Sequence, residues 1–221
     1  MKSRSAAFTT AMIAVCWLVF VLDYLSPKTQ GVGDLTLRLA LFPNAVLRGE
    51  WWRLITYGFV HANLYHILVN SIALFQAGDF VEYVYGSRRY AVIYSVALVG
   101  GGIAAYTATV GNPVFTLGAS GAIMGIFGAM AVLAFRLPPL RKELLRAAIV
   151  PVILTLGIGF FTPGISNAAH IGGLISGVLA AAFITPVQGR EIIRQFGPAR
   201  ITPVDNHDTG SETAWDPPRR G

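Results

Sequence analysis

Ser120 is the residue of this sequence best placed to act as a nucleophile. It lies within Gly118-Ala119-Ser120-Gly121, directly before a long apolar run that reaches Phe135. At the start of a helix, a serine between small residues has free space around its hydroxyl and backbone N–H groups without intrahelical partners beside it. A serine nucleophile, and the pocket for the oxyanion that its attack creates, need these two features. The motif alone is also typical of helices packed tightly in a membrane.

Three further polar residues could complete such a site. His66 and Asn70 are four positions apart, so a helix would place both on one face, and His170 lies in a separate apolar segment. Polar side chains inside a membrane are costly, so they tend to face the interior of a helix bundle and to have a function. Any one of these residues could merely hydrogen-bond to a neighbouring helix. Together with the serine they are four polar residues, and we expect them at a similar depth in the membrane, which favours a shared site.

The composition predicts that membrane helices position these residues. Of the 221 residues, 54% are hydrophobic and only 13% are charged, whereas a soluble domain has about 25% charged residues. We therefore expect an all-α, polytopic membrane protein with six transmembrane helices, each near the roughly 20 residues that a spanning helix needs. The six segments are Ala6–Leu25, His61–Phe80, Ala91–Thr109, Gly118–Phe135, Leu144–Phe161 and Ala168–Thr185.

The lysines and arginines predict how these helices are oriented. The first segment follows Lys2 and Arg4 as a signal peptide would, but it is long enough to span and has no clear cleavage site, so we interpret it as a retained helix. With the N-terminus inside, thirteen lysines and arginines lie on the cytoplasmic side and four outside. Such an excess marks the cytoplasmic side. We expect an N-in, C-in protein of the plasma membrane, with the four polar site residues near its extracytoplasmic face.

Glycines on two of the expected helices could bring the serine and a histidine together. Gly121 and Gly125 are four positions apart on one helix, and Gly173 and Gly177 share this spacing on another. Such faces let two backbones approach closely. If the two helices pack on them, the histidine of the second comes within hydrogen-bond reach of the serine, about 3 Å. The glycines could serve packing alone, but the same packing would build the pair.

The polar segments divide the chain into three parts. We assign residues 1–34 to the N-terminus, the first transmembrane helix and the start of the first outer loop, and residues 35–185 to the core. Residues 186–221 form a cytoplasmic tail that we expect to be disordered, from about Gly197 onward. The first outer loop, Lys28–Val60, is apolar in places, which predicts a structured loop lying partly in the membrane interface. Trp51 and Trp52 would lie at headgroup depth, as they would in a plain aromatic belt.

Two other chemistries fit the polar residues less well. A metal site would use His61, His66 and His170, but His61 and His66 are five positions apart rather than four, and no carboxylate or cysteine lies at their depth. The single cysteine, Cys16, excludes an intramolecular disulfide and a cysteine-based metal site. An ion path would need acids inside the membrane, whereas the acids of this chain lie at segment ends, where they would cap helices or pair with arginines.

Five motifs occur in a specific order along the chain. They are Trp52-Arg53, His66-x-x-x-Asn70, Gly78-x-x-x-Glu82-x-x-x-Gly86, Gly118-x-Ser120-Gly121 and Ala169-His170-x-x-Gly173-x-x-x-Gly177. With these motifs the chain resembles the rhomboid intramembrane serine proteases over Leu35 to Thr185, in their basic six-helix bacterial form. Each motif is weak by itself, but the order and spacing of all five are specific.

The resemblance implies a catalytic dyad without an aspartate. Ser120 would be the nucleophile and His170 the general base. His66, Asn70 and the Ser120 N–H would form the oxyanion hole, in which Gly118 leaves room. Members of this family act on single-span or polytopic membrane proteins, which they cut near the outer interface, usually after a small residue.

The resemblance also implies structural roles and limits. Trp52 and Arg53 would help to place the first loop, and Glu82 and the helix glycines would support the fold. The protein would work among membrane lipids, without metal, cofactor or nucleic acid. Helix Leu144–Phe161 and the loop 162–167 are candidates for a gate and cap, or only a helix end and a turn. One alternative is a non-catalytic relative that binds transmembrane helices. Another is a small transporter, which is disfavoured because the sequence shows neither buried acids nor an evident inverted repeat.

Overall fold

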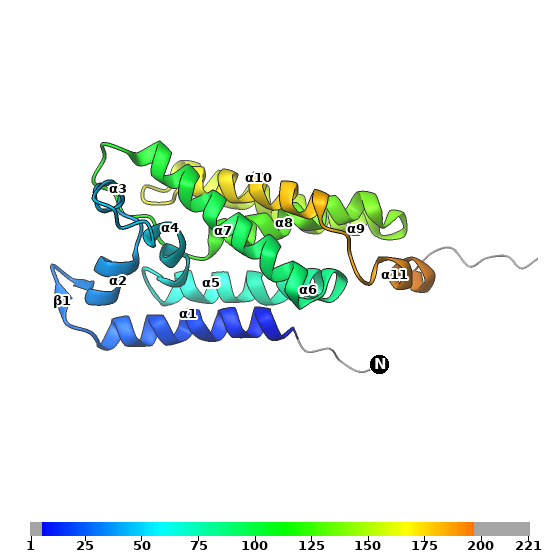
Figure 1. Cartoon of the computed structure of the whole chain (residues 1–221), viewed down its shortest axis with the longest axis horizontal. Helices are drawn as coiled ribbons and strands as arrows, with labels where there is room; N and C mark the ends of the chain where they lie inside the picture. Colours follow the sequence, from blue (N-terminus) through cyan, green and yellow to red (C-terminus); the bar gives the residue numbers. More distant parts are fainter. Residues whose placement is uncertain (1–5, 197–221) are drawn as a thin grey trace, which may run out of the picture.

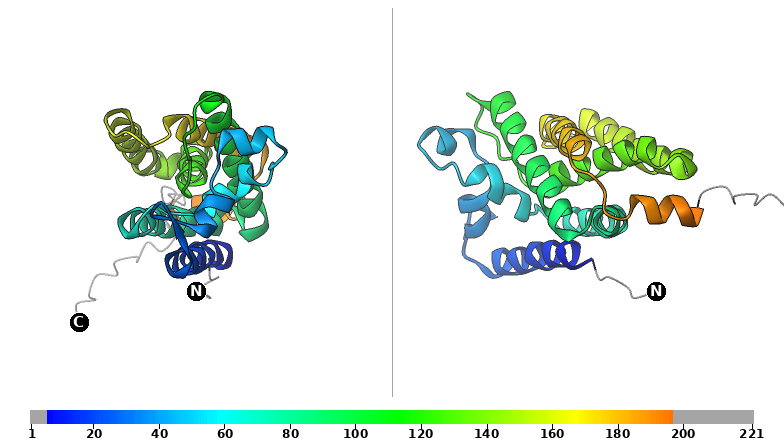
Figure 2. Two further views of the ribbon diagram at one scale, coloured as in Figure 1. Left: turned by 90° about the vertical axis from the view of Figure 1, so that its left-hand side faces the viewer. Right: turned by 45° about the vertical axis from the view of Figure 1, so that its right-hand side comes forward.

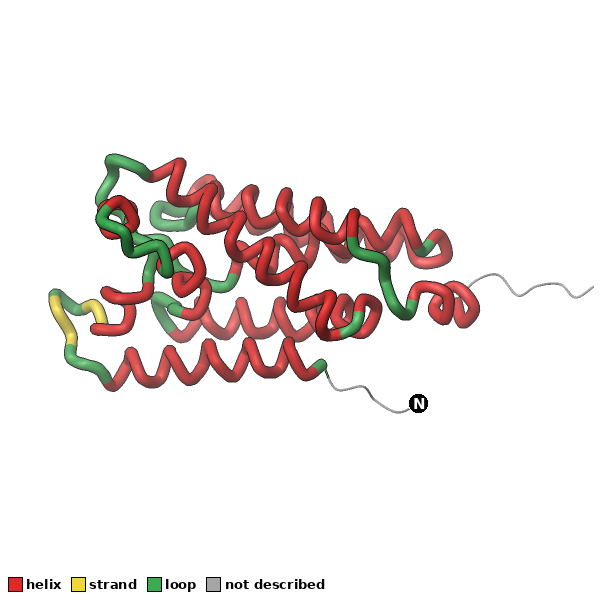
Figure 3. Tube along the Cα trace, viewed as in Figure 1, coloured by secondary structure: helices red, strands yellow, loops and turns green. Residues whose placement is uncertain are grey.

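The computed structural model describes residues 6–196, which are predominantly helical (Figure 1; Figure 3). Four helical stretches of this part are long and apolar enough to cross a membrane: Ala7–Leu25, Leu64–Tyr85, Ser87–Thr109 and Pro138–Phe161. Two shorter apolar helices, Ser120–Arg136 and Asn167–Phe183, have 17 residues each. These helices agree with the predicted helical membrane protein.

The elements follow one another with short connections. In chain order they are α1 (Ala7–Leu25), β1 (Lys28–Thr29), β2 (Val32–Gly33), α2 (Asp34–Leu39), α3 (Pro43–Leu47), α4 (Arg53–Thr56), the 3-10 helix η1 (Tyr57–Phe59), α5 (Leu64–Ala73), the π-helical turn η2 (Leu74–Gly78), α6 (Asp79–Tyr85), α7 (Ser87–Thr109), α8 (Ser120–Arg136), the 3-10 helix η3 (Pro138–Leu140), α9 (Arg141–Phe161), α10 (Asn167–Phe183) and α11 (Gly189–Phe196). β1 and β2 form a small antiparallel hairpin. The short elements from β1 to η1 gather at one end of the bundle, which we call the loop end, and α11 lies at the other (Figure 1).

α8 forms the centre of the bundle. Most of its residues are buried, and it packs against α7, α9 and α10. Its buried residues are mainly glycine, alanine, methionine and isoleucine, so neighbouring helices can approach its backbone closely. α1 and α9 lie on the outside of the bundle (Figure 2), and few of their residues are buried by protein. Lipid would cover these outer faces in a membrane.

The second apolar helix begins and ends later than the sequence predicts. The expected span was His61–Phe80, but α5, η2 and α6 form one continuous helix over Leu64–Tyr85. Asn63 is extended, and its side-chain oxygen accepts the N–H of His66 at 2.9 Å, so Asn63 is the N-cap. The helix ends where Gly86 adopts a φ of +78°. His61 therefore precedes the helix and is not part of it.

Glu82 connects this helix to α1. Its carboxylate accepts the backbone N–H groups of Phe8 at 3.0 Å and Thr9 at 2.8 Å, and the hydroxyl of Ser87 at 2.6 Å. An acid at a segment end was expected either to cap a helix or to pair with an arginine. Glu82 caps a helix, because it accepts the free N–H groups at the N-terminus of α1. These hydrogen bonds satisfy the carboxylate, so the helix can continue past Phe80 although it contains a buried acid.

The first part of the predicted tail is helical. Val187 and Gln188 both donate their N–H groups to the carbonyl of Val84, at 2.9 and 3.0 Å, which holds the linker between α10 and α11 against the end of α6. Ile192 of α11 is buried. Residues 189–196 are thus ordered by packing of an apolar side chain, whereas the tail assigned to 186–221 was expected to be disordered. The disorder expected from Gly197 lies outside the described residues.

Candidate active site

Ser120 and His170 are in direct contact. The Ser120 hydroxyl oxygen lies 2.8 Å from Nε2 of His170, although fifty positions separate the two residues. Ser120 is the first residue of α8, and His170 lies in the first turn of α10, whose N-cap Ser166 accepts the N–H of Ala169. The His170 side chain is buried, and its Nδ1 has no hydrogen-bond partner among the described residues. At this distance a neutral imidazole can accept the proton of the serine.

The glycines of α8 and α10 face one another below this contact. A side chain on Gly173 would overlap the carbonyl group of Gly121, and one on Gly177 would overlap the backbone of Gly125. The two helices therefore touch through their backbones at both positions. This close packing leaves the first turns of the helices near enough for a short serine side chain to reach the imidazole.

α7 takes part in the same packing, which the spacing of the other glycines did not reveal. A side chain on Gly101 would lie 2.9 Å from the carbonyl oxygen of Ala169, and one on Gly100 would overlap Ser176 of α10. The signal in the sequence was the uninterrupted run of glycines 100–102. Consecutive glycines weaken a helix, so they indicate that a neighbouring backbone needs the space.

His66 and Asn70 lie beside the segment that precedes Ser120. Gly118 has a φ of +113°, and a side chain there would lie 2.7 Å from the His66 ring and 3.9 Å from Nδ2 of Asn70. Only glycine combines this conformation with so close an approach. Asn70 Nδ2 donates to the His66 carbonyl at 3.0 Å, which uses one of its two hydrogens. The structure thus places His66, Ser120 and His170 in the first turns of α5, α8 and α10, and Asn70 one turn further along α5 than His66.

His61 packs against His66. Their ring centroids are 5.0 Å apart in an edge-to-face arrangement. His61 is only 3% exposed, and neither of its ring nitrogens has a hydrogen-bond partner in the described part of the chain. No group of three or more histidine, cysteine or acidic residues that could hold a metal occurs within residues 6–196. His61 is therefore placed to position the His66 ring, a role that its sequence context did not indicate.

The first loop holds the segment that leads into Ser120, and it is structured as predicted. Leu41 and Thr116 exchange two backbone hydrogen bonds, at 3.0 and 2.9 Å. The carbonyl of Tyr57 accepts the N–H of Gly118 at 2.9 Å. Segments distant in the sequence are thereby fixed to each other, and the start of α8 depends on the conformation of the loop.

Arg53 in turn fixes the loop. It is 6% exposed and donates to the carbonyls of Leu37 and Ala40, at 2.9 and 2.7 Å. Its guanidinium also contacts the Glu50 carboxylate at 2.7 Å. Ala40 precedes the residue that bonds to Thr116, so Arg53 supports the serine segment through a short series of contacts.

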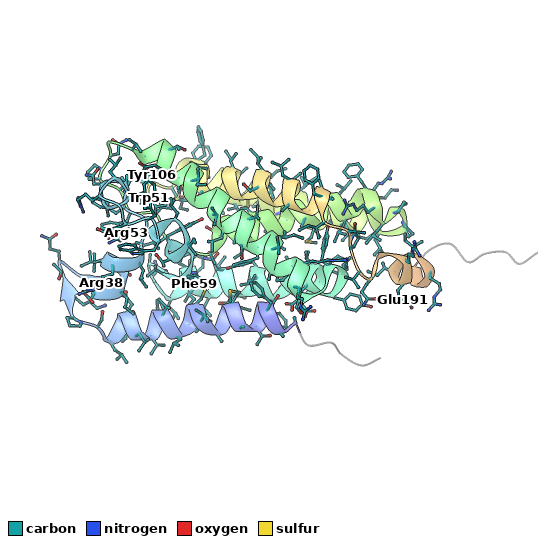
Figure 4. All side chains as sticks on the ribbon, viewed as in Figure 1. Arg38, Trp51, Arg53, Phe59, Tyr106 and Glu191 are labelled. Atoms are coloured by element: carbon teal, nitrogen blue, oxygen red, sulfur yellow. The ribbon has the colours of Figure 1, made fainter. Side chains whose placement is uncertain are left out.

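The tryptophans of the loop lie at its surface. Trp51 and Trp52 are 59% and 52% exposed. Figure 4 places Trp51, Arg53 and Arg38 at the loop end and Glu191 at the opposite end of the bundle. The position of the two tryptophans at the membrane interface stays a prediction.

Comparisons with known proteins identify the family. Residues 48–187 match the family model described as Rhomboid domain. The chain is 38% identical to Rhomboid protease GluP of Bacillus subtilis, over 82% of this chain and 35% of that protein. It is 30% identical to Rhomboid protease GlpG of Klebsiella pneumoniae, over 86% of this chain and 67% of that protein. RHOMBOID-like protein 5 of Arabidopsis thaliana is 30% identical over 68% of this chain and 48% of that protein.

The chain therefore belongs to the rhomboid family, as its five motifs predicted. Its apolar helices and this family membership confirm a polytopic helical membrane protein. The chain spans about a third of the length of GluP, so the match covers only part of that relative.

Proposed function

We propose that this protein is an intramembrane serine endopeptidase with Ser120 as nucleophile and His170 as general base. The observation that carries the proposal is the 2.8 Å contact between the Ser120 hydroxyl and Nε2 of His170. It is supported by the bacterial relatives GluP and GlpG, both of which are named as proteases.

The proposed reaction has two halves. In the first, His170 Nε2 takes the hydroxyl proton while the Ser120 oxygen attacks the carbonyl carbon of the substrate. The imidazolium then protonates the leaving amine, and the acyl chain remains on the serine as an ester. In the second half, His170 takes a proton from water, the hydroxide attacks the ester, and the proton returns to the serine oxygen.

Three donors are available for the oxyanion. The N–H of Ser120, in the first turn of α8, has no intrahelical acceptor. Asn70 keeps one amide hydrogen free of its bond to the His66 carbonyl. The His66 ring lies against Gly118, two residues before the nucleophile. Donors held in place in a site of low dielectric stabilise the developing negative charge more than water does.

Packing, instead of a third catalytic residue, would keep the His170 ring in position. The residue is 4% exposed, and Nδ1 lacks a hydrogen-bond partner within residues 6–196. The backbone contact of Gly121, the residue after Ser120, with Gly173, one turn after His170, lies next to the ring. A ring enclosed by helices this close has few alternative rotamers, so the dyad needs no carboxylate to orient it.

We further propose six crossings, cytoplasmic termini and a site that opens to the extracytoplasmic side. The excess of lysine and arginine at one set of connections supports this orientation. At 17 residues, α8 and α10 are about 25 Å long, less than the roughly 30 Å of the hydrocarbon core. Helices this short can begin below the membrane surface, which would leave room for water above the serine.

α9 is the proposed gate for a transmembrane substrate. It is an outer helix of the bundle, and Phe160 and Phe161 at its end are 79% and 83% exposed. There Asn167 Nδ2 donates to the Leu156 carbonyl at 3.1 Å, which joins the end of α9 to the start of α10. A small displacement of α9 would let an unwound membrane segment reach the site, because a peptide bond in an intact helix is shielded.

The test uses the purified full chain in liposomes with a single-span membrane substrate. Wild type should cleave the substrate near its outer interface, and Ser120→Ala should not. Cleavage by both proteins would exclude the serine mechanism. A wild-type protein that binds the substrate but leaves it intact would instead favour the non-catalytic alternative, a protein that binds transmembrane helices.

A further inference from the structure

The end of the bundle opposite the active site carries a basic hollow of about 560 Å³. It lies between the turn that joins α6 to α7 and the linker that joins α10 to α11, and its lining includes Gly86, Ser87, Arg88, Arg89 and Val187. A second hollow of about 620 Å³ adjoins it across Val187 and adds Arg136 and Arg190. The proposed proteolysis uses none of these residues. We call the first of these the basic hollow.

The arginines of the basic hollow have little compensation. Arg88 is exposed and has neither a hydrogen bond nor an ion pair with any described residue. Arg89 is exposed too, and its one contact in residues 6–196 is a bond from Nη1 to the Thr185 carbonyl at 2.6 Å. The acid in the lining, Glu82, is buried, and its carboxylate accepts three bonds, from α1 and Ser87. Two positive charges are therefore left for a ligand.

The hydrogen-bond donors in the lining of the basic hollow suit a phosphate group. The two arginines can each offer paired N–H donors, the geometry that matches phosphate oxygens. Both belong to the first turn of α7, a 23-residue helix whose N-cap is Gly86 and therefore has no capping side chain. The lining residues thus include both arginine side chains and the backbone N–H groups of a first helical turn.

We propose that the basic hollow binds the phosphate headgroup of an anionic phospholipid. The bilayer is the expected source, because the hollow lies where one helix long enough to span ends and the next begins, and lipid headgroups meet the ends of spanning helices. Tyr83 and Val187 in the lining are 38% and 49% exposed, which provides apolar contact for the glycerol and the first methylenes of a lipid. Anionic lipids are concentrated in the cytoplasmic leaflet, which the proposed orientation puts on this side.

A bound headgroup would also connect two parts of the fold. Arg88 and Arg89 belong to α7, and Val187 belongs to the linker that follows α10. α7 and α10 are the helices that pack on each other next to the dyad. A lipid that bridges their ends would stabilise this packing by binding the folded chain more tightly than the unfolded one.

The test measures lipid binding, not proteolysis, so it stands apart from the proposed function. The full chain, purified in detergent, is titrated with phosphatidylglycerol or phosphatidylcholine, and bound lipids are counted by native mass spectrometry. Arg88→Glu should weaken phosphatidylglycerol binding about tenfold or more, since it removes charge-assisted hydrogen bonds and adds repulsion. Phosphatidylcholine should bind more weakly than phosphatidylglycerol, and an equal concentration of inorganic phosphate should displace little of the lipid.

Arg146→Glu is the matched control, because Arg146 is exposed on α9 outside both hollows and the change in charge is the same. Equal weakening by the two variants would show diffuse attraction and overturn the site. Full affinity in Arg88→Glu, or complete displacement by inorganic phosphate, would also overturn the proposal. If Arg88→Glu does not fold, Val187→Glu places a negative charge in the same hollow from the linker, and it should weaken binding equally.

Discussion

Gly177 of α10 lies directly against Gly125 of α8, so closely that a side chain on Gly177 would overlap the backbone of its neighbour. This contact lies deeper in the bundle than the pair formed by Ser120 and His170, and it limits how far apart the two helices can be at their starts. The candidate site thus depends on packing between helices as much as on the residues that would carry out the chemistry.

Widening this contact should therefore separate the dyad. We expect Gly177→Val to reduce proteolysis strongly and to destabilise the fold by roughly 1–3 kcal/mol, the usual effect of overpacking. Gly157→Ala is the control, because a side chain at this α9 glycine meets nothing within 4 Å. It should leave activity unchanged. Cleavage rates and melting temperatures of both variants check this, and a fully active Gly177→Val would contradict it.

Gly118 should be needed for its space as well as for its conformation. Gly118→Ala puts a methyl group 2.7 Å from the His66 ring at a φ of +113°. Gly111→Ala is a matched control with a φ of +87° and no neighbour within 4 Å, so it has the backbone strain alone. Both variants should lose some thermal stability, but only Gly118→Ala should lose most of its kcat. Equal kcat values would show that strain explains the whole effect.

His66 and Asn70 should act mainly in the transition state. Loss of an oxyanion donor typically lowers kcat by about 10²–10³. We expect His66→Ala and Asn70→Ala each to show such a loss with little change in KM, because the contact strengthens only as the carbonyl is attacked. The melting temperature should fall modestly. A variant that keeps its full rate and only melts earlier would assign these residues to helix packing.

Arg53 should matter although it lies away from the dyad. Arg53→Gln removes charge-assisted bonds to Glu50 and to the carbonyls of Leu37 and Ala40, so both activity and stability should fall. Arg38→Gln on the same loop is the control, because Arg38 is 70% exposed in its pair with Asp34 and should have little effect. Identical behaviour of the two variants would contradict the account of the loop as a support for the serine segment.

Sequence spacing was informative where function and packing need particular residues. The glycines of α8 and α10, four positions apart on each helix, suggested which faces would meet, and the polar residues at similar depth suggested the content of the site. The roles of these residues stay predictions. Glycines 100–102 carried the same kind of signal for α7, but the partner helix could not be named without the fold.

Other features could not be deduced from apolar runs. The start of α5 depends on Asn63 in an extended conformation, which hydropathy does not detect. The acceptor role of Glu82 depends on N–H groups of α1 more than seventy positions away. The helix in residues 189–196 carries the buried Ile192, a contact that its polar composition does not reveal.

In the proposed mechanism, Ser120 is a nucleophile activated by His170. The most direct measurement is labelling of the purified protein with a fluorophosphonate probe, followed by mass spectrometry to locate the adduct. We predict one adduct, on Ser120, in the wild type, none in Ser120→Ala, and much slower labelling in His170→Ala, because the base that deprotonates the hydroxyl is lost. An adduct on another residue, or wild-type labelling rates in His170→Ala, would contradict the account.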